Sequence, residues 1–263
     1  ALARQSGVIL EGCNAAAFDS FISAGLKLTG SRGAPDRRRR LAFFSLEDPT
    51  ARRLLETASV AVGFRHCERA LRLFVTAVFG GSPKLRAAGR GEEMPRRSGL
   101  AGDVILMPET YRGVPASEVR HLFQAAAAHA ACHLAFASAR QPVGALKPLQ
   151  VALITLIEDA RVEALAMRRF PGLRRLWSRY HIAEPTGVAT APGLLARLAR
   201  ALIDPSYRDE NAFIERGRAR FAAEALATLD DPAMSRRIGG RLGNDLGQQR
   251  LQFNPRNYVI EPV

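Results

Sequence analysis

Two histidines stand four residues apart in an alanine-rich stretch, AAAAHAACHLAFA, that covers residues 125–137. They are His129 and His133, and their spacing predicts that both rings project from the same face of a helix. Two neutral imidazoles placed in this way can bind one metal ion, as in the H-E-x-x-H pattern of zinc hydrolases. Ala130 stands where that pattern has its glutamate. The sequence therefore predicts the ligand spacing of a metal site without the general base of a hydrolase.

Two protein ligands do not hold a zinc ion, so a third must come from another segment. The stretch VALITLIEDARVEALAM, residues 151–167, places Glu158 in a mostly apolar helical face, and burying a carboxylate without a partner is costly. In an antiparallel helical hairpin that turns near residue 143, position 129 faces position 157. We therefore predict Glu158 as the third ligand. Its other candidate partners are Arg161, three residues on, or a histidine in a core without metal.

The same stretch contains two further carboxylates with different expected roles. Asp159 and Glu163 are four residues apart, which indicates one helix face, and we expect that face to be exposed to solvent. Asp159 can instead orient a metal ligand from behind it. The residues expected around the metal site, as supports or in salt bridges, are Asp159, Arg161 and Glu163.

Helical periodicity dominates the rest of the chain, in which alanine, leucine and arginine are abundant and strand formers are sparse. The fold class that follows is mainly α with a small β-sheet (α+β). We expect one domain, residues 1–263, with N-terminal helices in 1–81, a central core in 82–180 and C-terminal helices in 181–263. Helices are expected at about 11–28, 48–80 with a break near 63, 116–140, 149–170, 193–203, 210–228 and 232–251, and extended segments at 83–88 and 102–113.

The chain is strongly basic, with a formal net charge of +13 carried by arginine rather than lysine. A basic surface attracts polyanions, so nucleic-acid binding is one candidate function. The densest run, Arg37–Arg40, has no aromatic residues interleaved with it and no recognised binding motif around it. We expect this run to lie in a solvated loop, and nucleic acid is not the expected partner.

The cysteines point to a cytoplasmic protein. Cys13, Cys67 and Cys132 are far apart and form no C-x-x-C pair, which is typical of free thiols in a reducing compartment. The start of the chain lacks the layout of a signal peptide, and no apolar run approaches the roughly 20 residues that a membrane span needs. The sequence contains no glycine-rich phosphate loop, so zinc is the only cofactor that its motifs suggest.

Four stretches resemble the N-terminal region of NorD-type proteins, the nitric oxide reductase activation proteins and the related Rubisco activase subunit CbbO. They are GDVILMPETYRG, AAAAHAACHLAFA, LITLIEDARVEALAMRRFPGLRRLW and GRLGNDLGQQRLQFNPRNYVIEPV, all within residues 102–263. The resemblance implies a cytosolic protein that works with a MoxR-class AAA+ ATPase to activate or remodel a client enzyme. It also implies a von Willebrand factor A domain, whose D-x-S-x-S motif does not occur in this chain.

The resemblance further implies a degenerate zincin-like core in residues 82–180, made of a strand, the HxxxH helix and a helix with E-D-x-R-x-E. His129, His133 and Glu158 then fall on its metal positions. Because Ala130 removes a general base, worth about 10²–10⁴ in rate, the expected function is a non-enzymatic adaptor with a structural or vestigial metal site. The first alternative is a metal-dependent peptidase that uses HxxxH plus glutamate, and the second is nucleic-acid binding through the arginine-rich surface.

Overall fold

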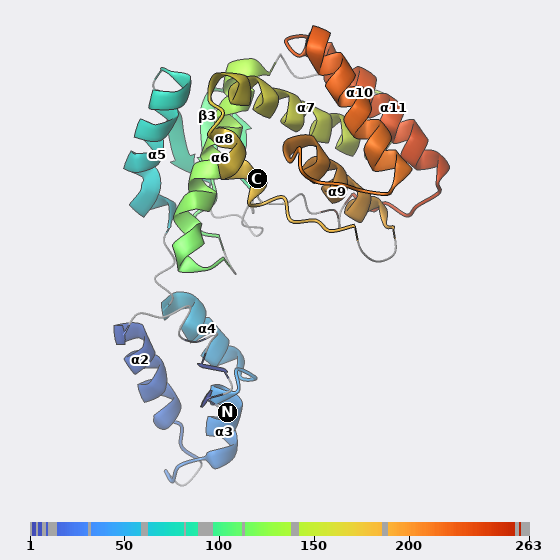
Figure 1. The fold of residues 1–263 in the computed structure, drawn as a ribbon. Coiled ribbons are helices and arrows are strands. Elements are labelled where there is room, and N and C mark those ends of the chain that lie inside the picture. Colours follow the sequence, from blue (N-terminus) through green and yellow to red (C-terminus); the bar gives the residue numbers. More distant parts are fainter. Residues whose placement is uncertain are drawn as a thin grey trace. The chain divides into compact units, whose positions relative to one another are not determined.

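A computed structural model shows a mainly helical chain with a small three-stranded sheet (Figure 1), which confirms the predicted fold class. The chain divides into two compact units, each described by itself: unit 1 is 1–67 with 109–120, and unit 2 is 68–108 with 121–263. The segment boundaries expected after residues 81 and 180 stay a prediction. The structure describes residues 2–3, 5–6, 9, 15–30, 33–58, 63–81, 83–88, 97–111, 114–137, 142–185, 189–255 and 258.

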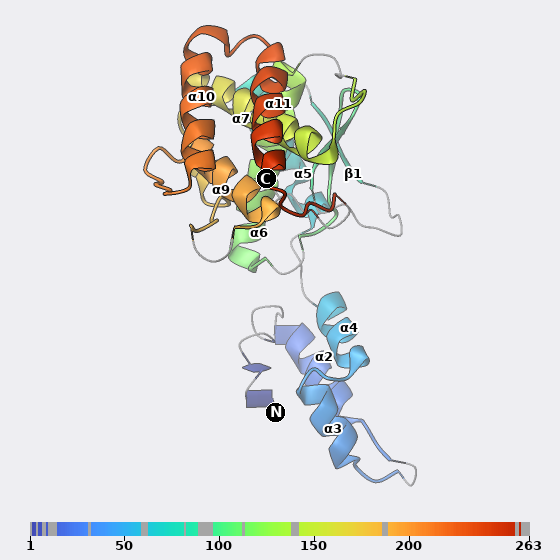
Figure 2. The same cartoon turned by 90° about the vertical axis from the view of Figure 1, so that its right-hand side faces the viewer.

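The described part of unit 1 includes the short helices α2 (Ala15–Leu26), α3 (Arg37–Phe44) and α4 (Pro49–Ala58), which Figure 2 shows from a second side. Phe21 and Phe43 stack with ring centroids 4.9 Å apart, which joins α2 to α3. The buried side chains of this small core are Ile9, Phe21, Phe43 and Ala51. The helix expected from residue 11 is described from residue 15, and residues 11–14 lie outside the described part.

The run Arg37–Arg40 forms the first turn of α3, so the expectation of a solvated loop is wrong. Asp36 caps this helix, because its carboxylate accepts the backbone N–H of Arg39 at 3.0 Å. The carbonyl groups at the end of a helix lack helical partners, and arginines fill that role here. The side chains of Arg39 and Arg40 donate to the carbonyl oxygens of Leu26, Leu28 and Thr29. Half of the run is therefore used to join α3 to the end of α2.

The sheet of unit 2 has the order β1-β3-β2, with β1 (Lys84–Ala87) parallel and β2 (Gly99–Ala101) antiparallel to β3 (Val104–Met107). The turn between β2 and β3 contains Gly102 at φ 61°, a conformation that favours glycine. The extended segments expected at 83–88 and 102–113 contain β1 and β3, whereas β2 was not expected. Strand β3 is central because it pairs with both other strands, and its inward side chains, Ile105 and Met107, are fully buried.

The helices of unit 2 form the larger core. Helix α7 contacts α9 and α11, and α10 contacts the same two helices (Figures 1 and 2). The core side chains between them include Leu153, Ile157, Leu194, Leu198, Phe213, Ile238 and Leu242. The helices are α5 (Phe64–Phe79) and α6 (Ala116–Phe136), which each give residues to both units, and α7 (Pro148–Arg169), α8 (Leu173–Ser178), α9 (Ala191–Ile203), α10 (Ala212–Thr228) and α11 (Ala233–Gln248).

Helix α6 is buried over most of its surface in the alanine run, because small side chains let its neighbours come close. Ala125 to Ala128 and Cys132 are all fully buried. The indole N–H of Trp177 on α8 donates to the carbonyl oxygen of Ala125 at 3.0 Å. The hydroxyl of Ser98, next to β2, donates to the carbonyl oxygen of Ala126 at 3.1 Å. The alanines thus fix the position of the helix that carries the two histidines.

Helix α7 is held from the other side by two glycines of α11. A Cβ atom added to Gly239 would lie 2.5 Å from the Cα of Ile154, and one added to Gly243 would lie 2.9 Å from the Cα of Gln150. Both distances are shorter than a carbon–carbon contact allows, so the helices meet backbone to backbone. The glycines that interrupt the predicted helix near 232–251 therefore serve close packing.

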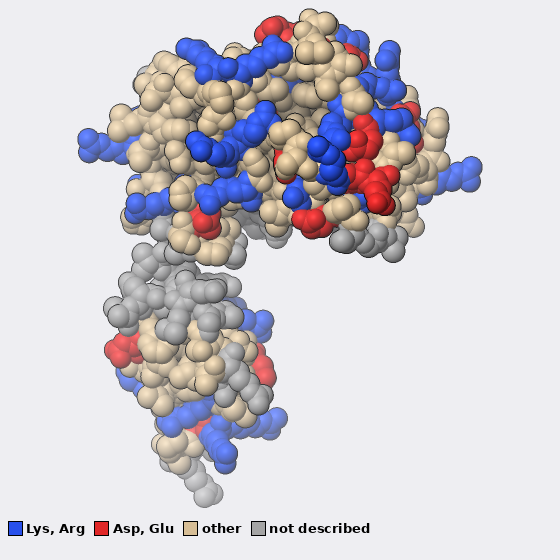
Figure 3. Space-filling model, in the orientation of Figure 1, with Lys and Arg blue, Asp and Glu red and all other residues tan. Residues whose placement is uncertain are grey.

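Three further features of the described residues are the charges on their surface, the hydropathy of their helices and the state of their cysteines. Arginine and lysine side chains are spread over the visible face of unit 2 with acidic ones among them (Figure 3). None of the described helices combines the length and the hydropathy that a membrane crossing needs. Cys67 and Cys132 are free and buried, and Cys13 lies outside the described residues.

Candidate metal site

Three side chains from α6 and α7 bring their ligand atoms together. Nε2 of His133 lies 3.1 Å from Oδ1 of Asp159, and Nε2 of His129 lies 3.7 Å from the same oxygen. All three ligand atoms lie within 4.8 Å of one another, so this group can hold a metal ion. It is the one such group of histidine, cysteine and acidic side chains in the part of the chain that the structure describes. The ligand pair predicted from HxxxH is therefore present on one helix face.

Glu163 supports the first histidine from behind. Its Oε1 accepts a hydrogen bond of 2.8 Å from Nδ1 of His129, which leaves Nε2 directed toward Asp159. A carboxylate on the far nitrogen fixes the tautomer and the ring orientation of a metal-binding histidine. Glu163 is only 5% exposed, which differs from the solvent-facing position expected for it. We call His129, His133, Asp159 and Glu163 the histidine cluster.

The charges of the cluster act on its own members. Burial works against the charged form of His129, but the hydrogen bond to Glu163 and the charges of Asp159 and Glu163 outweigh it and raise the pKa of His129 above 6.5. Burial also disfavours ionised Asp159, yet the hydrogen bond from His133 and the nearby cations lower the pKa of Asp159 below 3.8. Arg97 is one of these cations, 4.0 Å from Asp159. The cluster therefore keeps Asp159 ionised and ready to bind a cation.

Glu158, the residue predicted as the third ligand, is bound elsewhere. Its two oxygens accept hydrogen bonds of 2.7 and 2.8 Å from Arg161, and the hydroxyl of Ser235 donates to it at 2.5 Å. The arginine alternative noted from the sequence is thus the contact observed. Asp159 takes the place given to Glu158 in the prediction. We call Glu158, Arg161 and Ser235 the arginine cluster.

Two features of the helix geometry explain why Asp159, and not Glu158, meets the histidines. The pairs His129 with Glu163 and His133 with Asp159 show an antiparallel arrangement of α6 and α7. Position 129 lies opposite position 163, six residues beyond the predicted 157, so the hairpin turns later than residue 143. Adjacent residues on a helix project about 100° apart. The shift in register along α7 therefore places Asp159, rather than Glu158, beside the two histidines.

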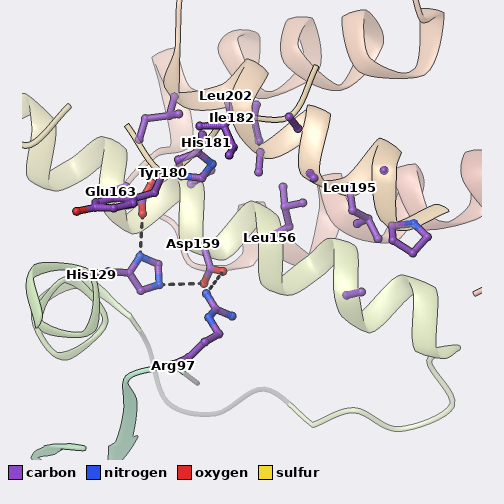
Figure 4. Close-up of a pocket in the computed structure, with 18 of the residues that line it drawn as sticks. Arg97, His129, Leu156, Asp159, Glu163, Tyr180, His181, Ile182, Leu195 and Leu202 are labelled. Atoms are coloured by element: carbon purple, nitrogen blue, oxygen red, sulfur yellow. Dashed lines mark hydrogen bonds and ion pairs between the residues drawn. The ribbon is translucent and has the colours of Figure 1, made fainter. Parts of the chain in front are cut away.

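A cavity of about 340 Å³ opens beside the histidine cluster. Figure 4 shows His129, Asp159, Glu163 and Arg97 at one end of it, and Leu156 and Leu195 along the rest. The remaining wall is largely apolar and comes from α7, α9 and the segment after α8; it includes Ala160, Met167, Ile182, Ala196, Ala199 and Leu202. The site thus joins a charged end to an apolar pocket.

Sequence reasoning missed Arg97, and it placed Asp159 behind the ligands rather than among them. Arg97 lies outside the expected helices and extended segments, and only tertiary structure brings it to α7. Asp159 could have been found, because His129 and His133 are four apart on one helix and Asp159 and Glu163 are four apart on the next. Two such pairs on antiparallel helices can meet residue by residue.

In comparisons with known proteins, no family model, curated protein or solved structure matches this chain. The resemblance to NorD-type proteins stays a prediction.

Proposed function

We propose that this chain is a metal-binding, non-hydrolytic adaptor domain of NorD type. It holds a zinc ion at His129, His133 and Asp159, and it helps a MoxR-class AAA+ ATPase of the cytoplasm to activate or remodel a client enzyme. The observation that carries the proposal is the convergence of three ligand atoms within 4.8 Å of one another beside an alanine at position 130.

The donor set suits zinc. Imidazole nitrogen and carboxylate oxygen bind zinc at about 2.0–2.1 Å, and in a tetrahedral site such ligand atoms lie about 3.3 Å apart. The separations from Asp159 Oδ1 to the two Nε2 atoms, 3.1 and 3.7 Å, lie on either side of that value. Zinc would replace the proton between His133 and Asp159, and it would supply a Lewis acid with a fourth coordination position left over.

The carboxylates around the site argue against hydrolysis. A general base must reach the attacking water and be free to take its proton. Of the described residues that line the cavity, the only carboxylates are Asp159 and Glu163. Glu163 already accepts a hydrogen bond from His129, and Asp159 would itself be a ligand of the zinc ion. Neither replaces the glutamate that is missing at Ala130, so the proposal assigns the metal a binding role.

The charge supports the adaptor part of the proposal over nucleic-acid binding. A chain of net charge +13 attracts acidic partner surfaces. On the face drawn in Figure 3 the basic side chains of unit 2 are dispersed among acidic ones rather than gathered in one stripe. In unit 1, Arg39 and Arg40 are engaged with backbone carbonyls.

Metal content after zinc loading and desalting tests the site. The wild type should retain about one zinc ion per chain, and His133→Ala should retain less than a tenth of that, because two ligands do not hold zinc. His121→Ala, on the same helix outside the cluster, is the matched control and should bind as the wild type does. Equal zinc in wild type and His133→Ala would overturn the assignment.

Two further assays test the rest of the proposal. Co-purification with the MoxR-class ATPase should occur in the presence of nucleotide, and its absence with and without nucleotide would count against the adaptor role. Zinc-loaded protein should leave casein intact. Sustained cleavage that stops on adding a chelator and disappears in His133→Ala would favour the peptidase alternative instead.

A further inference from the structure

We propose that the cavity beside the histidine cluster binds a carboxylate that carries an apolar chain, with the carboxylate on the metal ion and the chain between α7 and α9. This inference rests on the proposed function, because it needs the metal. It goes beyond that function by naming the chemical class of the ligand that the site takes.

The volume and lining of the cavity favour a small apolar group. Its volume of about 340 Å³ lies at the lower end of the roughly 300–1,000 Å³ typical of small-molecule sites. Its walls away from the cluster are mostly aliphatic, with Leu156 and Leu195 as buried core residues. Outside the cluster, the aromatic side chains in the lining are those of Tyr180, His181 and Tyr258. Such a space favours a chain of several methylene groups, since each one removed from water contributes about 0.8 kcal/mol.

The charged end selects the head group. A divalent ion and Arg97 together outweigh the carboxylates of Asp159 and Glu163 by one positive charge, so the loaded site attracts a single negative charge. His129 and Asp159 line the cavity themselves, which places an ion bound by them at its wall. Three protein ligands leave a position on the ion for one oxygen of a carboxylate. The complementary ligand is therefore a monoanion, and a neutral alcohol of the same length lacks the interaction.

Two sources can supply this chemistry: a free carboxylic acid and the C-terminal residue of a peptide that ends in a large aliphatic side chain. The probes separate them. Octanoate represents the free acid, and N-acetyl-Ala-Ala-Leu represents the peptide terminus, with its C-terminal amide as the uncharged comparison. Binding of either charged probe supports the inference, and the tighter of the two identifies the source.

Titration calorimetry with zinc-loaded protein is the test. From acetate through butanoate and hexanoate to octanoate, affinity should rise about fourfold for each methylene until the cavity is full. Octanol should bind at least tenfold more weakly than octanoate, and removing zinc should abolish the difference between them. Octanoate that binds no more tightly than acetate, or octanol that binds as well as octanoate, overturns the inference.

Variants locate the binding. Ala199→Phe fills the cavity and should abolish octanoate binding while zinc content stays at the wild-type level. Ala223→Phe, on the exposed face of α10, is the matched control and should bind octanoate normally. Arg97→Gln should weaken octanoate several-fold and leave octanol unchanged, which gives a second reading should Ala199→Phe fail to fold. Octanoate binding that survives both Ala199→Phe and Arg97→Gln places the ligand elsewhere and refutes the site.

The two proposals fail in different ways. If the wild type binds zinc but shows no preference for octanoate, this inference is wrong and the metal-binding function stands. If the wild type binds no zinc at all, the proposed function is wrong and the inference falls with it.

Discussion

Helix α7 contributes neighbouring residues, Glu158 and Asp159, to two polar clusters. The clusters differ in how many of their polar groups have hydrogen-bond partners within the protein. In the arginine cluster, Arg161 is fully buried and donates to both oxygens of Glu158 and to the carbonyl oxygens of Phe136 and Leu229. Its hydrogen-bonding groups are directed at fixed protein atoms. Such a cluster joins α7 to the end of α6 and to the turn between α10 and α11, and it is structural.

The histidine cluster is built in the opposite way. One contact, between Nδ1 of His129 and Glu163, holds a ring from behind, while Nε2 of each histidine lies close to Oδ1 of Asp159. The side chains of His133 and Asp159 are 20% and 19% exposed, so the point is open to a ligand. A charged cluster whose polar groups all have protein partners stabilises the fold, whereas a cluster of converging ligand atoms is suited to binding an ion.

The largest effect on stability is expected from removing the arginine. Arg161→Ala should lower the free energy of unfolding by about 3–5 kcal/mol, because it removes the guanidinium partner of Glu158 and the donor to the carbonyl oxygens of Phe136 and Leu229. Chemical denaturation measures the loss. The zinc content of the folded fraction should stay unchanged, and an unfolding free energy within 1 kcal/mol of the wild type would show that the cluster is not structural.

The backbone contact between α11 and α7 supports the arginine cluster, since α11 also supplies Ser235. Gly239→Ala should cost about 1–3 kcal/mol, because the new methyl group overlaps the backbone at Ile154. Gly240→Ala has no atom within 4 Å of the new carbon and should stabilise the helix by about 0.5–1 kcal/mol. Thermal and urea unfolding of the two variants should shift in opposite directions; shifts of the same sign and size would contradict the close packing.

A substitution in the histidine cluster should change the affinity for zinc rather than the free energy of unfolding. Glu163→Gln should weaken zinc binding by about 10–100-fold, because the ring of His129 loses the charged acceptor that orients it. Competition with a chromophoric chelator measures the change. Glu68→Gln, on α5 and outside the cluster, is the control and should leave zinc affinity unchanged. Unaltered affinity in Glu163→Gln would show that this carboxylate does not support the metal site.

A smaller effect is expected from pH in the metal-free protein. The pKa of His129 is raised above 6.5 in the folded chain, so protonated His129 adds stability that is fully present below pH 6.5 and is lost as pH rises through the raised pKa. Zinc competes with the same proton, so its affinity should rise over the same range. Unfolding at several pH values with and without zinc checks both signs, and a His129→Gln variant should show neither dependence.

Much of this arrangement follows from local sequence patterns. Periodicity predicts a helix at 149–170, within one residue of the observed ends of α7, and the HxxxH spacing identifies the histidine pair. Short elements such as α3, α8 and β2 escape such patterns, because too few residues carry a periodic signal. Whether Glu158 or Asp159 meets the histidines depends on the register of α6 and α7, because adjacent side chains on a helix project about 100° apart. Distant contacts set that register: Trp177 of α8 donates to the backbone of α6, and Gly239 of α11 lies against the backbone of α7.

The most direct test of the account compares these two neighbouring carboxylates. Zinc content and the visible spectrum of the cobalt-substituted protein should be measured for Asp159→Ala and Glu158→Gln. We expect Asp159→Ala to lose the metal and its tetrahedral cobalt absorption, and Glu158→Gln to keep both even if it unfolds more easily. Metal retained by Asp159→Ala and lost by a folded Glu158→Gln would show that the histidines bind with the other carboxylate and would contradict the account.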